Sequence, residues 1–309
     1  MTEGLPSSVL LKDVAAVSAT DVWAAGGDLV HGGNQIFHWD GRSWRPVPFG
    51  ALPGAGPADE LRLTAAPGGP VWLNYFPGIE IELPRHSTLL RWDGRRWRRQ
   101  SLPCARGCGV DRMTVGSASD VWATGTDDRR PLAAHWDGRR WLRTVLPSAG
   151  TVLPSADTVA GAVVASSPGN AWLPEYACAS TEKAQMHDAT PVLVCTSSRL
   201  QVAHWNGRRW SASAFPAPLP GRPVERHVYA AADTAGRLRL LAPIGDAGSG
   251  DRYLYFDRER WCVGVAPKDS EDVTAMAAVP GTSATIAVGS MPPDSFKSEP
   301  FAMFSGPLR

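Results

Sequence analysis

Apolar segments separated by Asp-Gly or Asn-Gly turns recur along this chain. The clearest copy is at residues 135–141, where His-Trp precedes Asp-Gly and Arg-Arg-Trp follows it. Related copies lie at 39–44, 92–97 and 205–210, and a more divergent copy lies at 256–261. Asp-Gly and Asn-Gly between extended segments favour tight hairpins, because both residues tolerate the positive φ of a type I′ turn. The pattern therefore predicts β-strands joined by hairpins along the whole chain.

A second sequence motif precedes these hairpins. It reads Asp-Val-Trp-Ala-Ala-Gly at residues 21–26 and Asp-Val-Trp-Ala-Thr-Gly at 120–125, with looser forms at 71–73 and 170–172. All thirteen tryptophans fall into three columns of this repeat, at positions 23, 72, 122 and 172, at 39, 92, 136 and 205, and at 44, 97, 141, 210 and 261. A chance scatter would not produce these columns, so the repeat is a property of the fold.

Each repeat accommodates four short strands: a small apolar strand A, strand B with the first Trp, strand C, and strand D opening with the last Trp. A period of 40–50 residues is typical of propeller blades. We predict an all-β, six-bladed β-propeller of four-stranded antiparallel blades in a single domain, residues 1–309. The N-terminal residues 2–7 are expected to supply the outer strand of the last blade. The blades fall near 8–50, 58–103, 109–148, 156–217, 224–267 and 270–309.

These two phrases, Asp-Val-Trp-Ala-x-Gly and His-Trp-Asp-Gly-x-x-Trp, resemble the repeats of bacterial β-propeller proteins common in actinobacteria. The resemblance covers nearly the whole chain and implies the propeller fold. Many such proteins are extracytoplasmic and many have no assigned activity, so the resemblance implies little about function, and propellers serve as binding modules, enzymes and scaffolds alike.

Composition narrows the class of partner. The formal net charge is +1, so no global field attracts nucleic acid or an anionic membrane. Arg pairs decorate the turns at 95–96, 139–140 and 208–209, but neighbouring Asp residues partly neutralise them, and we expect no nucleic-acid binding. The sequence contains no run of about 18 apolar residues, so it predicts no membrane-spanning helix. The first residues carry no signal-peptide pattern, which leaves a cytoplasmic protein or a leader removed elsewhere.

The cysteines bear on that choice. Cys104 and Cys108 are close in sequence, and Cys178 and Cys195 share one long connection, so each pair is expected to close a disulfide. Disulfides favour an oxidising compartment, and we expect an extracytoplasmic or secreted protein, with a cytoplasmic one as the alternative. Reduced core cysteines or a shared zinc site are the other interpretations of the four. Cys262 follows Trp261 and is expected to be a buried free thiol.

The predicted connections differ between the two ends of each blade. The A–B and C–D turns are short and uniform, whereas the B–C and D–A connections, such as 74–87 and 174–199, are long and vary between blades. Variable loops on a rigid scaffold are where function tends to lie. We therefore expect the ligand to bind at the long-loop end of the blades, through Tyr75, Phe76, His86, Arg129, Tyr176 and His187.

The alternative is an enzyme, a hydrolase or lyase/cyclase acting on a small molecule in the axial pocket. His187 or His86 would then be the general base, with Glu80, Glu82 or Asp188 as its partner. His38, His135 and His204 recur before the C-strand Trp; repetition in every blade indicates packing, since an active site needs one asymmetric cluster.

Several motifs are missing from the sequence. There is no Gly-rich phosphate loop, no nucleophile elbow, no Cys-x-x-Cys and no calcium loop, and the His residues have no metal-ligand spacing, so we expect no cofactor and no metal site. The predicted function is a monomeric, ligand-binding propeller that recognises a glycan, a peptide, a protein partner or a small molecule. A purely structural scaffold is the third possibility.

Overall fold

The computed structural model shows an all-β protein that divides into two compact units, Met1–Thr144 and Val145–Arg309. The described residues contain no α-helix, and therefore no helix that is long and apolar enough to cross a membrane. They are 4–28, 30–48, 60–76, 87–104, 108–127, 130–147, 159–184, 192–215, 219–220, 228–232, 236–244, 252–257, 260–265, 272–279, 282, 284–291 and 299–305.

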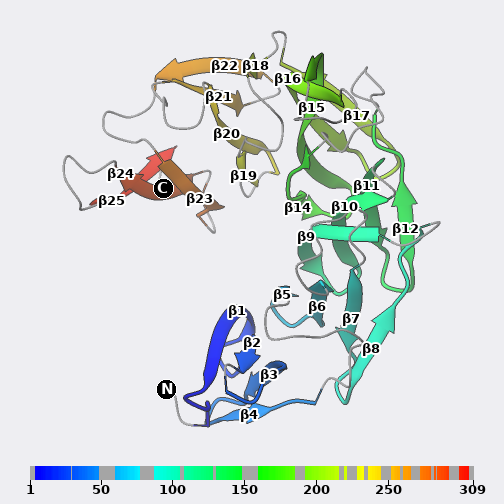
Figure 1. Ribbon diagram of the computed structural model, residues 1–309, viewed down its shortest axis with the longest axis vertical. Coiled ribbons are helices and arrows are strands. Elements are labelled where there is room, and N and C mark those ends of the chain that lie inside the picture. Colours follow the sequence, from blue (N-terminus) through cyan, green and yellow to red (C-terminus); the bar gives the residue numbers. More distant parts are fainter. Residues whose placement is uncertain are drawn as a thin grey trace. The chain divides into compact units, whose positions relative to one another are not determined.

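The described residues of the first unit form three antiparallel sheets of four strands, each made from one copy of the repeat (Figure 1). Every sheet is a simple meander in which each strand pairs with the next one along the chain. The strands are β1 (Val9–Ser18), β2 (Asp21–Asp28), β3 (Asn34–Trp39), β4 (Trp44–Pro46), β5 (Glu60–Ala65), β6 (Val71–Phe76), β7 (Thr88–Trp92), β8 (Trp97–Gln100), β9 (Cys108–Ser117), β10 (Asp120–Asp127), β11 (Arg130–Trp136) and β12 (Trp141–Thr144).

The second unit also contains three antiparallel sheets among its described residues. The fourth repeat forms a larger sheet, in which two short strands pair with β15 and one with β16; the described part of the last repeat has three strands. The strands are β13 (Val159–Ala160), β14 (Val164–Ser167), β15 (Asn170–Ala184), β16 (Val192–Trp205), β17 (Trp210–Ala214), β18 (Leu219–Pro220), β19 (Tyr229–Ala232), β20 (Leu238–Ile244), β21 (Arg252–Asp257), β22 (Arg260–Val265), β23 (Asp272–Ala278), β24 (Thr285–Met291) and β25 (Glu299–Ser305).

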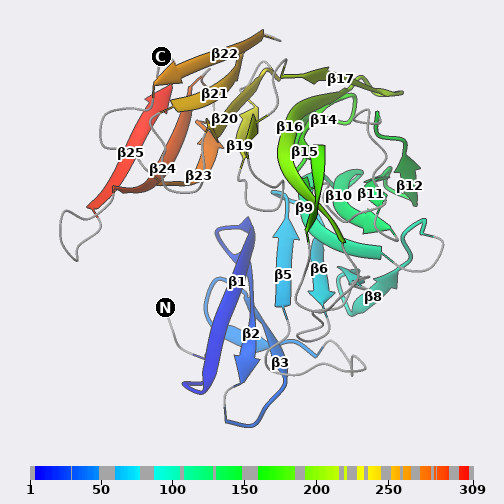
Figure 2. The ribbon, with the colours of Figure 1, turned by 45° about the horizontal axis from the view of Figure 1, so that its top comes forward.

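Within each unit the first strands of consecutive sheets lie next to one another. In the first unit β1 lies beside β5 (Figure 2), and β5 contacts β9. In the second unit β14 contacts β19, and β19 contacts β23. Four-stranded meanders whose first strands converge in this way stack like the blades of a propeller.

Tryptophans fill the space between neighbouring sheets, as the three columns predicted. Trp23 of β2 packs on Trp92 and Trp97 of the second sheet, with ring centroids 5.0 and 5.5 Å apart. Trp72 of β6 packs in the same way on Trp136 and Trp141 of the third sheet, at 5.4 and 5.3 Å. Because each buried aromatic side chain removes a large apolar area from water, these contacts stabilise a separate hydrophobic cluster between each two successive sheets of the first unit.

The Asp-Gly turns form hairpins, but Asp and Gly have different roles in them. The flanking tryptophans pair directly, as Trp39 does with Trp44, and Gly41 begins the turn with a φ of +89°. Asp40 precedes the glycine and accepts the backbone N–H groups of Arg42 and Ser43 at 2.9 and 3.0 Å. The Ser43 N–H, with that of Arg42, holds the pKa of Asp40 below its usual range. The positive φ therefore falls on glycine, and Asp or Asn is needed as an acceptor.

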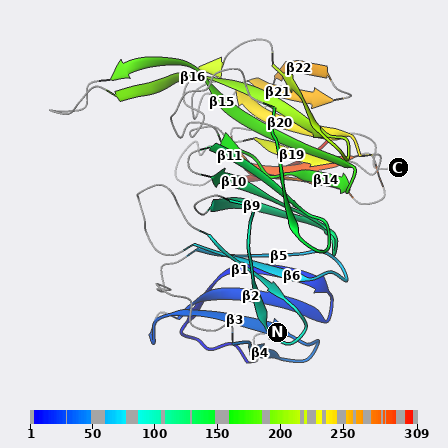
Figure 3. The same cartoon turned by 90° about the vertical axis from the view of Figure 1, so that its right-hand side faces the viewer.

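The long connection predicted at residues 174–199 is instead an extended hairpin. Strands β15 and β16 remain paired from Ala171–Trp205 out to Ala184–Val192. The resulting ribbon extends beyond the neighbouring strands of its unit (Figure 3). The Cys178–Cys195 disulfide joins its two strands, so residues that looked like a loop are held by a ladder of backbone hydrogen bonds and a covalent bond.

Both predicted disulfides are present, Cys104–Cys108 and Cys178–Cys195, with Cα atoms 6.0 and 5.7 Å apart. Cys262 is free, as predicted, but the prediction that it is buried was wrong, because its side chain is exposed on β22. Strand D is the outer strand of its sheet, which explains why a residue next to the packed Trp261 faces solvent.

The predicted closure of the last sheet by the N-terminal residues stays a prediction. Among the described residues the sheet β23–β24–β25 has no fourth strand. The described start of the chain lies against the first sheet, since Gly4 approaches the backbone of Trp44 so closely that a Cβ atom would overlap its carbonyl oxygen.

Candidate functional site

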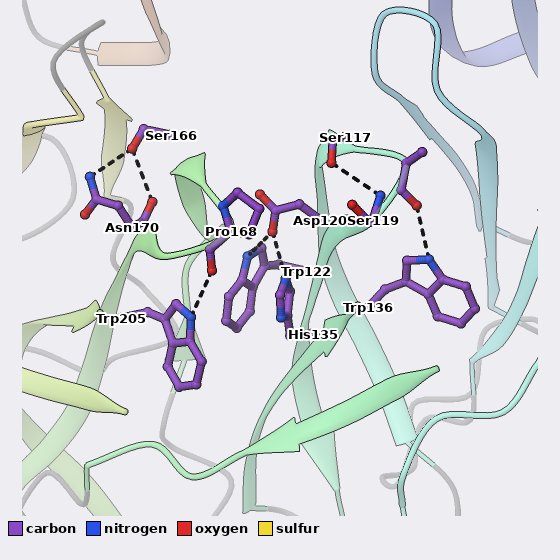
Figure 4. A network of polar contacts seen from close by, with 11 residues as sticks. Ser117, Ser119, Asp120, Trp122, His135, Trp136, Ser166, Pro168, Asn170 and Trp205 are labelled. Atoms are coloured by element: carbon purple, nitrogen blue, oxygen red, sulfur yellow. Dashed lines mark hydrogen bonds and ion pairs between the residues drawn. The ribbon is translucent and has the colours of Figure 1, made fainter. Parts of the chain in front are cut away.

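A Trp-His pair with a shared carboxylate recurs at the short-turn end of the sheets, the end that carries the A–B and C–D connections. In the third sheet the Asp120 carboxylate accepts the indole N–H of Trp122 at 3.1 Å and lies 2.8 Å from Nε2 of His135 (Figure 4). The imidazole stacks on the indole, with centroids 4.2 Å apart. Asp21, Trp23 and His38 repeat this arrangement in the first sheet. The recurrent His residues therefore have the packing role that their repetition predicted.

The second sheet replaces the histidine with an arginine. Arg91 lies directly opposite Trp72, where the first, third and fourth sheets have His opposite Trp. Its guanidinium carbon lies 5.8 Å from the centre of the Trp72 ring and 5.5 Å from that of Trp136. A cation over an aromatic face is attracted by the ring quadrupole, so Arg91 covers the indole as the imidazole does elsewhere.

The fourth repeat departs from this arrangement in a way that involves the next sheet. Asn170 stands where the first and third repeats have Asp, and its Oδ1 atom lies 2.7 Å from Nε2 of His204. Its Nδ2 atom donates to Ser166 Oγ at 2.9 Å and to the carbonyl oxygen of Gly236 at 3.0 Å. The indole N–H of Trp172 also goes to Gly236, at 3.1 Å. Figure 4 shows Asn170 joined to Ser166 by a hydrogen bond from its side-chain nitrogen.

The carbonyl of Gly236 determines the orientation of the Asn170 amide. A carbonyl oxygen can only accept, so the amide group that faces it must be the NH₂. The side-chain oxygen of Asn170 then faces His204, which donates from Nε2. Gly236 has a φ of +74°, and a Cβ atom there would lie 2.4 Å from Asn170 Nδ2. Glycine is thus required both by the backbone conformation and by the close approach of the two sheets.

A cavity of about 340 Å³ lies beside this junction of the fourth and fifth sheets. Its apolar lining is buried and is formed by Trp172, Leu238 and Phe256. Asn170, His204 and Arg237 contribute half-buried polar groups, together with Gly236. His204 stacks on Trp172 at 3.9 Å between centroids, and Phe256 meets the same indole at 6.0 Å. An apolar floor with a few converging polar groups is the usual composition of a ligand pocket.

This cavity lies at the short-turn end of its sheets, whereas the sequence predicted a site at the long-loop end. Most of the predicted site residues cannot be compared with it, because His86, Arg129, His187, Glu80, Glu82 and Asp188 lie outside the described residues. Phe76 is the last residue of β6. The sequence signal that could have indicated the cavity is the change from Asp to Asn at position 170.

The two tyrosines predicted to bind ligand belong to the core. Tyr75 lies in β6 and Tyr176 in β15, and each is 1% exposed. Tyr75 packs in the cluster between the first two sheets, and Tyr176 in the cluster that contains Trp172 and Phe256. The strands extend further than the sequence pattern indicated, so these aromatic rings fill the space between sheets and are not part of an exposed binding surface.

One buried carboxylate lies deeper in the same sheet. Glu175 of β15 is 2% exposed and accepts a hydrogen bond from the amide of Gln201 on β16. Burial raises the pKa of Glu175 to about 7, against the smaller opposing effect of the Gln201 hydrogen bond. Its charge state therefore changes near neutral pH, although it does not line the cavity.

A further His-carboxylate contact lies at the long-loop end of the first sheet. Asp28 is buried and accepts the backbone N–H groups of Val30 and His31 at 3.0 Å, while His31 Nδ1 lies 3.1 Å from its second oxygen. The backbone N–H of His31, as the main cause, lowers the pKa of Asp28 to about 2. These contacts close the β2–β3 connection. Within the part of the chain that the structure describes, no three His, Cys, Asp or Glu side chains gather into a metal-binding group.

Comparison with known proteins supports the fold class. No protein-family model and no curated protein matches this chain. A protein of unknown function from Dyadobacter fermentans matches with 10% identity over 98% of this chain and 96% of that one, at a TM-score of 0.50. YCF48 bound to a D1 peptide matches with 13% identity over 92% and 78%, at 0.49. The Aleuria aurantia lectin in complex with α-methyl-L-fucoside matches with 14% identity over 85% and 78%, at 0.42.

At these identities the similarity concerns the fold alone. This similarity of fold agrees with the observed sheets, which are four-stranded antiparallel meanders packed on one another through aromatic side chains. The chain is thus an all-β protein with propeller-like architecture.

Proposed function

We propose that this protein is a six-bladed β-propeller of the bacterial repeat type that binds a ligand, and that the ligand occupies the cavity between the fourth and fifth sheets. The observation that carries the proposal is the cavity itself, which lies where the fourth repeat has Asn170 in place of Asp and where Asn170 and Trp172 both donate to Gly236 of the next sheet. Structural requirements would repeat in every blade. The contacts of Asn170 and Trp172 with Gly236 join two sheets beside a cavity, and we expect such a local change of the repeat at a ligand-binding site.

The composition of the cavity favours binding over catalysis. Its histidine, His204, faces the neutral side chain of Asn170, so the described residues of the lining include no His-carboxylate pair to act as a general base. The His-Asp pairs in the described residues belong to the stacked arrangements at Trp23 and Trp122 and to the β2–β3 connection. An enzyme that uses His86 or His187 remains the alternative.

The size of the cavity restricts the ligand. Pockets for small ligands occupy roughly 300–1,000 Å³, and 340 Å³ is at the lower end of that range. One compact group fits, such as a single sugar of a glycan or one side chain of a peptide or protein partner. The two disulfides support a location in an oxidising, extracytoplasmic compartment, where such ligands are accessible.

A variant that fills the cavity tests the proposal. Leu238→Phe places a larger side chain in the floor, whereas Leu142→Phe makes the same change at a surface position of β12. Ligand-observed NMR against a panel of monosaccharides and short peptides should find compounds that bind the wild type and Leu142→Phe but not Leu238→Phe. Compounds that bind all three proteins equally would place the site elsewhere and contradict the proposal.

A further inference from the structure

The three C–D turns of the first unit, with the strands that follow them, form a strongly basic surface. They are residues 39–46, 92–100 and 136–144, which we call the arginine turns. Together they contain nine arginines and three aspartates, whereas the whole chain has a formal net charge of +1. The near-neutral total therefore hides a local excess of positive charge on three neighbouring sheets.

The aspartates of the arginine turns are already bound within their own turns. Each accepts the backbone N–H groups of the two residues after the turn glycine. A second oxygen of Asp40 pairs with Arg45 at 2.9 Å, and one of Asp93 with Arg98 at 2.6 Å. Six further arginines are exposed and form no ion pair with another described residue, namely Arg42, Arg95, Arg96, Arg99, Arg139 and Arg140.

The arginine turns lie at the same end of neighbouring sheets. Trp92, which opens the second turn, packs on Trp23 of the first sheet with ring centroids 5.0 Å apart. Trp136, which opens the third turn, packs in the same way on Trp72 of the second sheet, at 5.4 Å. Because the packing of successive sheets repeats, their guanidinium groups recur along one side of the unit.

The A–B turns beside the arginine turns add hydroxyl groups to this surface. A Cβ atom on Gly41 would lie 2.9 Å from the side chain of Thr20, and one on Gly138 would lie 2.9 Å from Ser119. Thr20 and Ser119 are both exposed. The aspartates that follow these A–B turns are held in the Trp-His arrangements. Cations and hydroxyls are thus the groups that this part of the surface offers to a ligand.

We infer that the arginine turns bind an acidic polysaccharide, whose carboxylates pair with exposed arginines on successive sheets. The guanidinium group matches a carboxylate through two parallel, charge-assisted hydrogen bonds. One exposed ion pair contributes little by itself. A ligand that carries a charge on each repeating unit contacts several turns at once, and linked contacts add to a useful affinity. A repeated basic turn therefore fits a polymer with repeated charges.

The structure favours a polysaccharide over a single-stranded nucleic acid. Proteins that bind single strands combine basic groups with aromatic side chains on which the bases stack. The tryptophans at the second and third turns are instead packed on Trp23 and Trp72. Hydroxyl and guanidinium groups, which remain accessible, suit the hydroxyls and carboxylates of acidic sugars. The inference does not depend on the cavity between the fourth and fifth sheets.

Calorimetric titration of the full chain with three probes tests the inference. Oligogalacturonate carries one carboxylate on each sugar, its methyl ester is the uncharged form of the same polymer, and single-stranded DNA with the same number of charges represents a nucleic acid. The oligogalacturonate should bind at low salt more tightly than the other two probes. Its affinity should fall as salt rises, because binding to a polyanion releases counterions.

Two matched pairs of substitutions locate the surface. Arg95→Gln with Arg139→Gln removes one guanidinium group from each of two turns and should weaken oligogalacturonate about three- to tenfold. Arg112→Gln with Arg199→Gln removes the same total charge from exposed positions of β9 and β16. This control should change the affinity less than about twofold, because salt screens distant charges.

The other results each contradict the inference. Equal binding of the acid and its methyl ester would exclude a role for charge, and equal weakening by the two pairs of substitutions would indicate a general charge effect. Tighter binding of DNA would assign a nucleic acid as the partner, and no binding of oligogalacturonate would exclude the surface as a polysaccharide site. A loss of oligogalacturonate binding in Leu238→Phe would assign that ligand to the cavity. Circular dichroism establishes that each variant is folded.

Discussion

Trp172 donates its indole hydrogen to the carbonyl oxygen of Gly236, 3.1 Å away in the next sheet. The equivalent tryptophans, Trp23 and Trp122, donate to an aspartate two residues earlier in their own strand. The same side chain thus closes a contact within one sheet in two repeats and joins two sheets in the fourth. This change of partner turns a repeated packing element into the wall of a cavity.

Asn170→Asp should destabilise the protein by about 1–2 kcal/mol, because the Gly236 carbonyl loses a donor and faces an oxygen instead. Chemical denaturation monitored by circular dichroism measures the loss. Asp120→Asn is the matched control, and it should cost less, since an amide oxygen can still accept from Trp122 and His135. A loss for Asn170→Asp no larger than that of the control would contradict the assigned amide orientation.

His135→Ala and His204→Ala should separate packing from binding. Each removes an imidazole stacked on an indole, so each should lower the free energy of unfolding by about 1–2 kcal/mol. Only His204 lines the cavity, so only His204→Ala should also weaken a ligand found in the NMR screen. If His135→Ala weakened that ligand as much as His204→Ala does, the effect would be one of stability and not of the site.

Glu175 should make stability fall as pH rises toward neutrality. Its pKa is about 7 in the folded protein and near 4.5 when exposed, so the folded state holds the proton more tightly. The stabilisation is complete below about pH 4.5 and is lost as the pH rises through 7. The loss from this group is roughly 3 kcal/mol at most, at about 1.4 kcal/mol per pKa unit.

Denaturation of Glu175→Gln at several pH values measures this effect. The variant should lack the decline between about pH 4.5 and 7, and it should be more stable than the wild type above pH 7. Glu182→Gln changes an exposed carboxylate on the same ribbon and should leave the decline in place. A wild type whose stability is level over this range would show that Glu175 is not buried as described.

The ribbon disulfide should contribute about 3 kcal/mol to stability, as the chain-entropy model gives for a loop of this length. Its two cysteines are 17 residues apart, and the bond joins strands that are already paired. Cys178→Ser with Cys195→Ser should lower the unfolding free energy by that amount without loss of the sheets.

Mass spectrometry under non-reducing conditions should find two disulfides. Native alkylation should modify one thiol, Cys262, because its side chain is exposed. Five reactive thiols in the natively expressed protein would contradict both bridges and with them the extracytoplasmic location.

Much of the fold followed from local patterns. The Trp columns predicted which residues join successive sheets, and the observed contacts of Trp23 and Trp72 confirm this. The turn motif predicted hairpins, although the acceptor role of Asp40 was not foreseen. Cysteines close in sequence predicted both disulfides. The ends of the strands were harder to predict from the sequence. Tyr75 and Tyr176 lie in segments whose composition resembles that of loops, and the pairing of these segments depends on neighbouring strands.

The sequence by itself determined the repeat, the order of strands and the packing role of its histidines, since these depend on contacts between residues close along the chain. Only the tertiary structure showed the candidate site. Asn170 and Trp172 donate hydrogen bonds to the carbonyl of Gly236, which is more than 60 residues away in the sequence. Asn is favoured over Asp at position 170 only because this carbonyl needs a donor. A hydrogen-bond partner supplied by another sheet leaves no periodic signal in sequence. The recurring Trp-Asp-Gly turns therefore define the scaffold, and a single changed partner beside them defines the cavity.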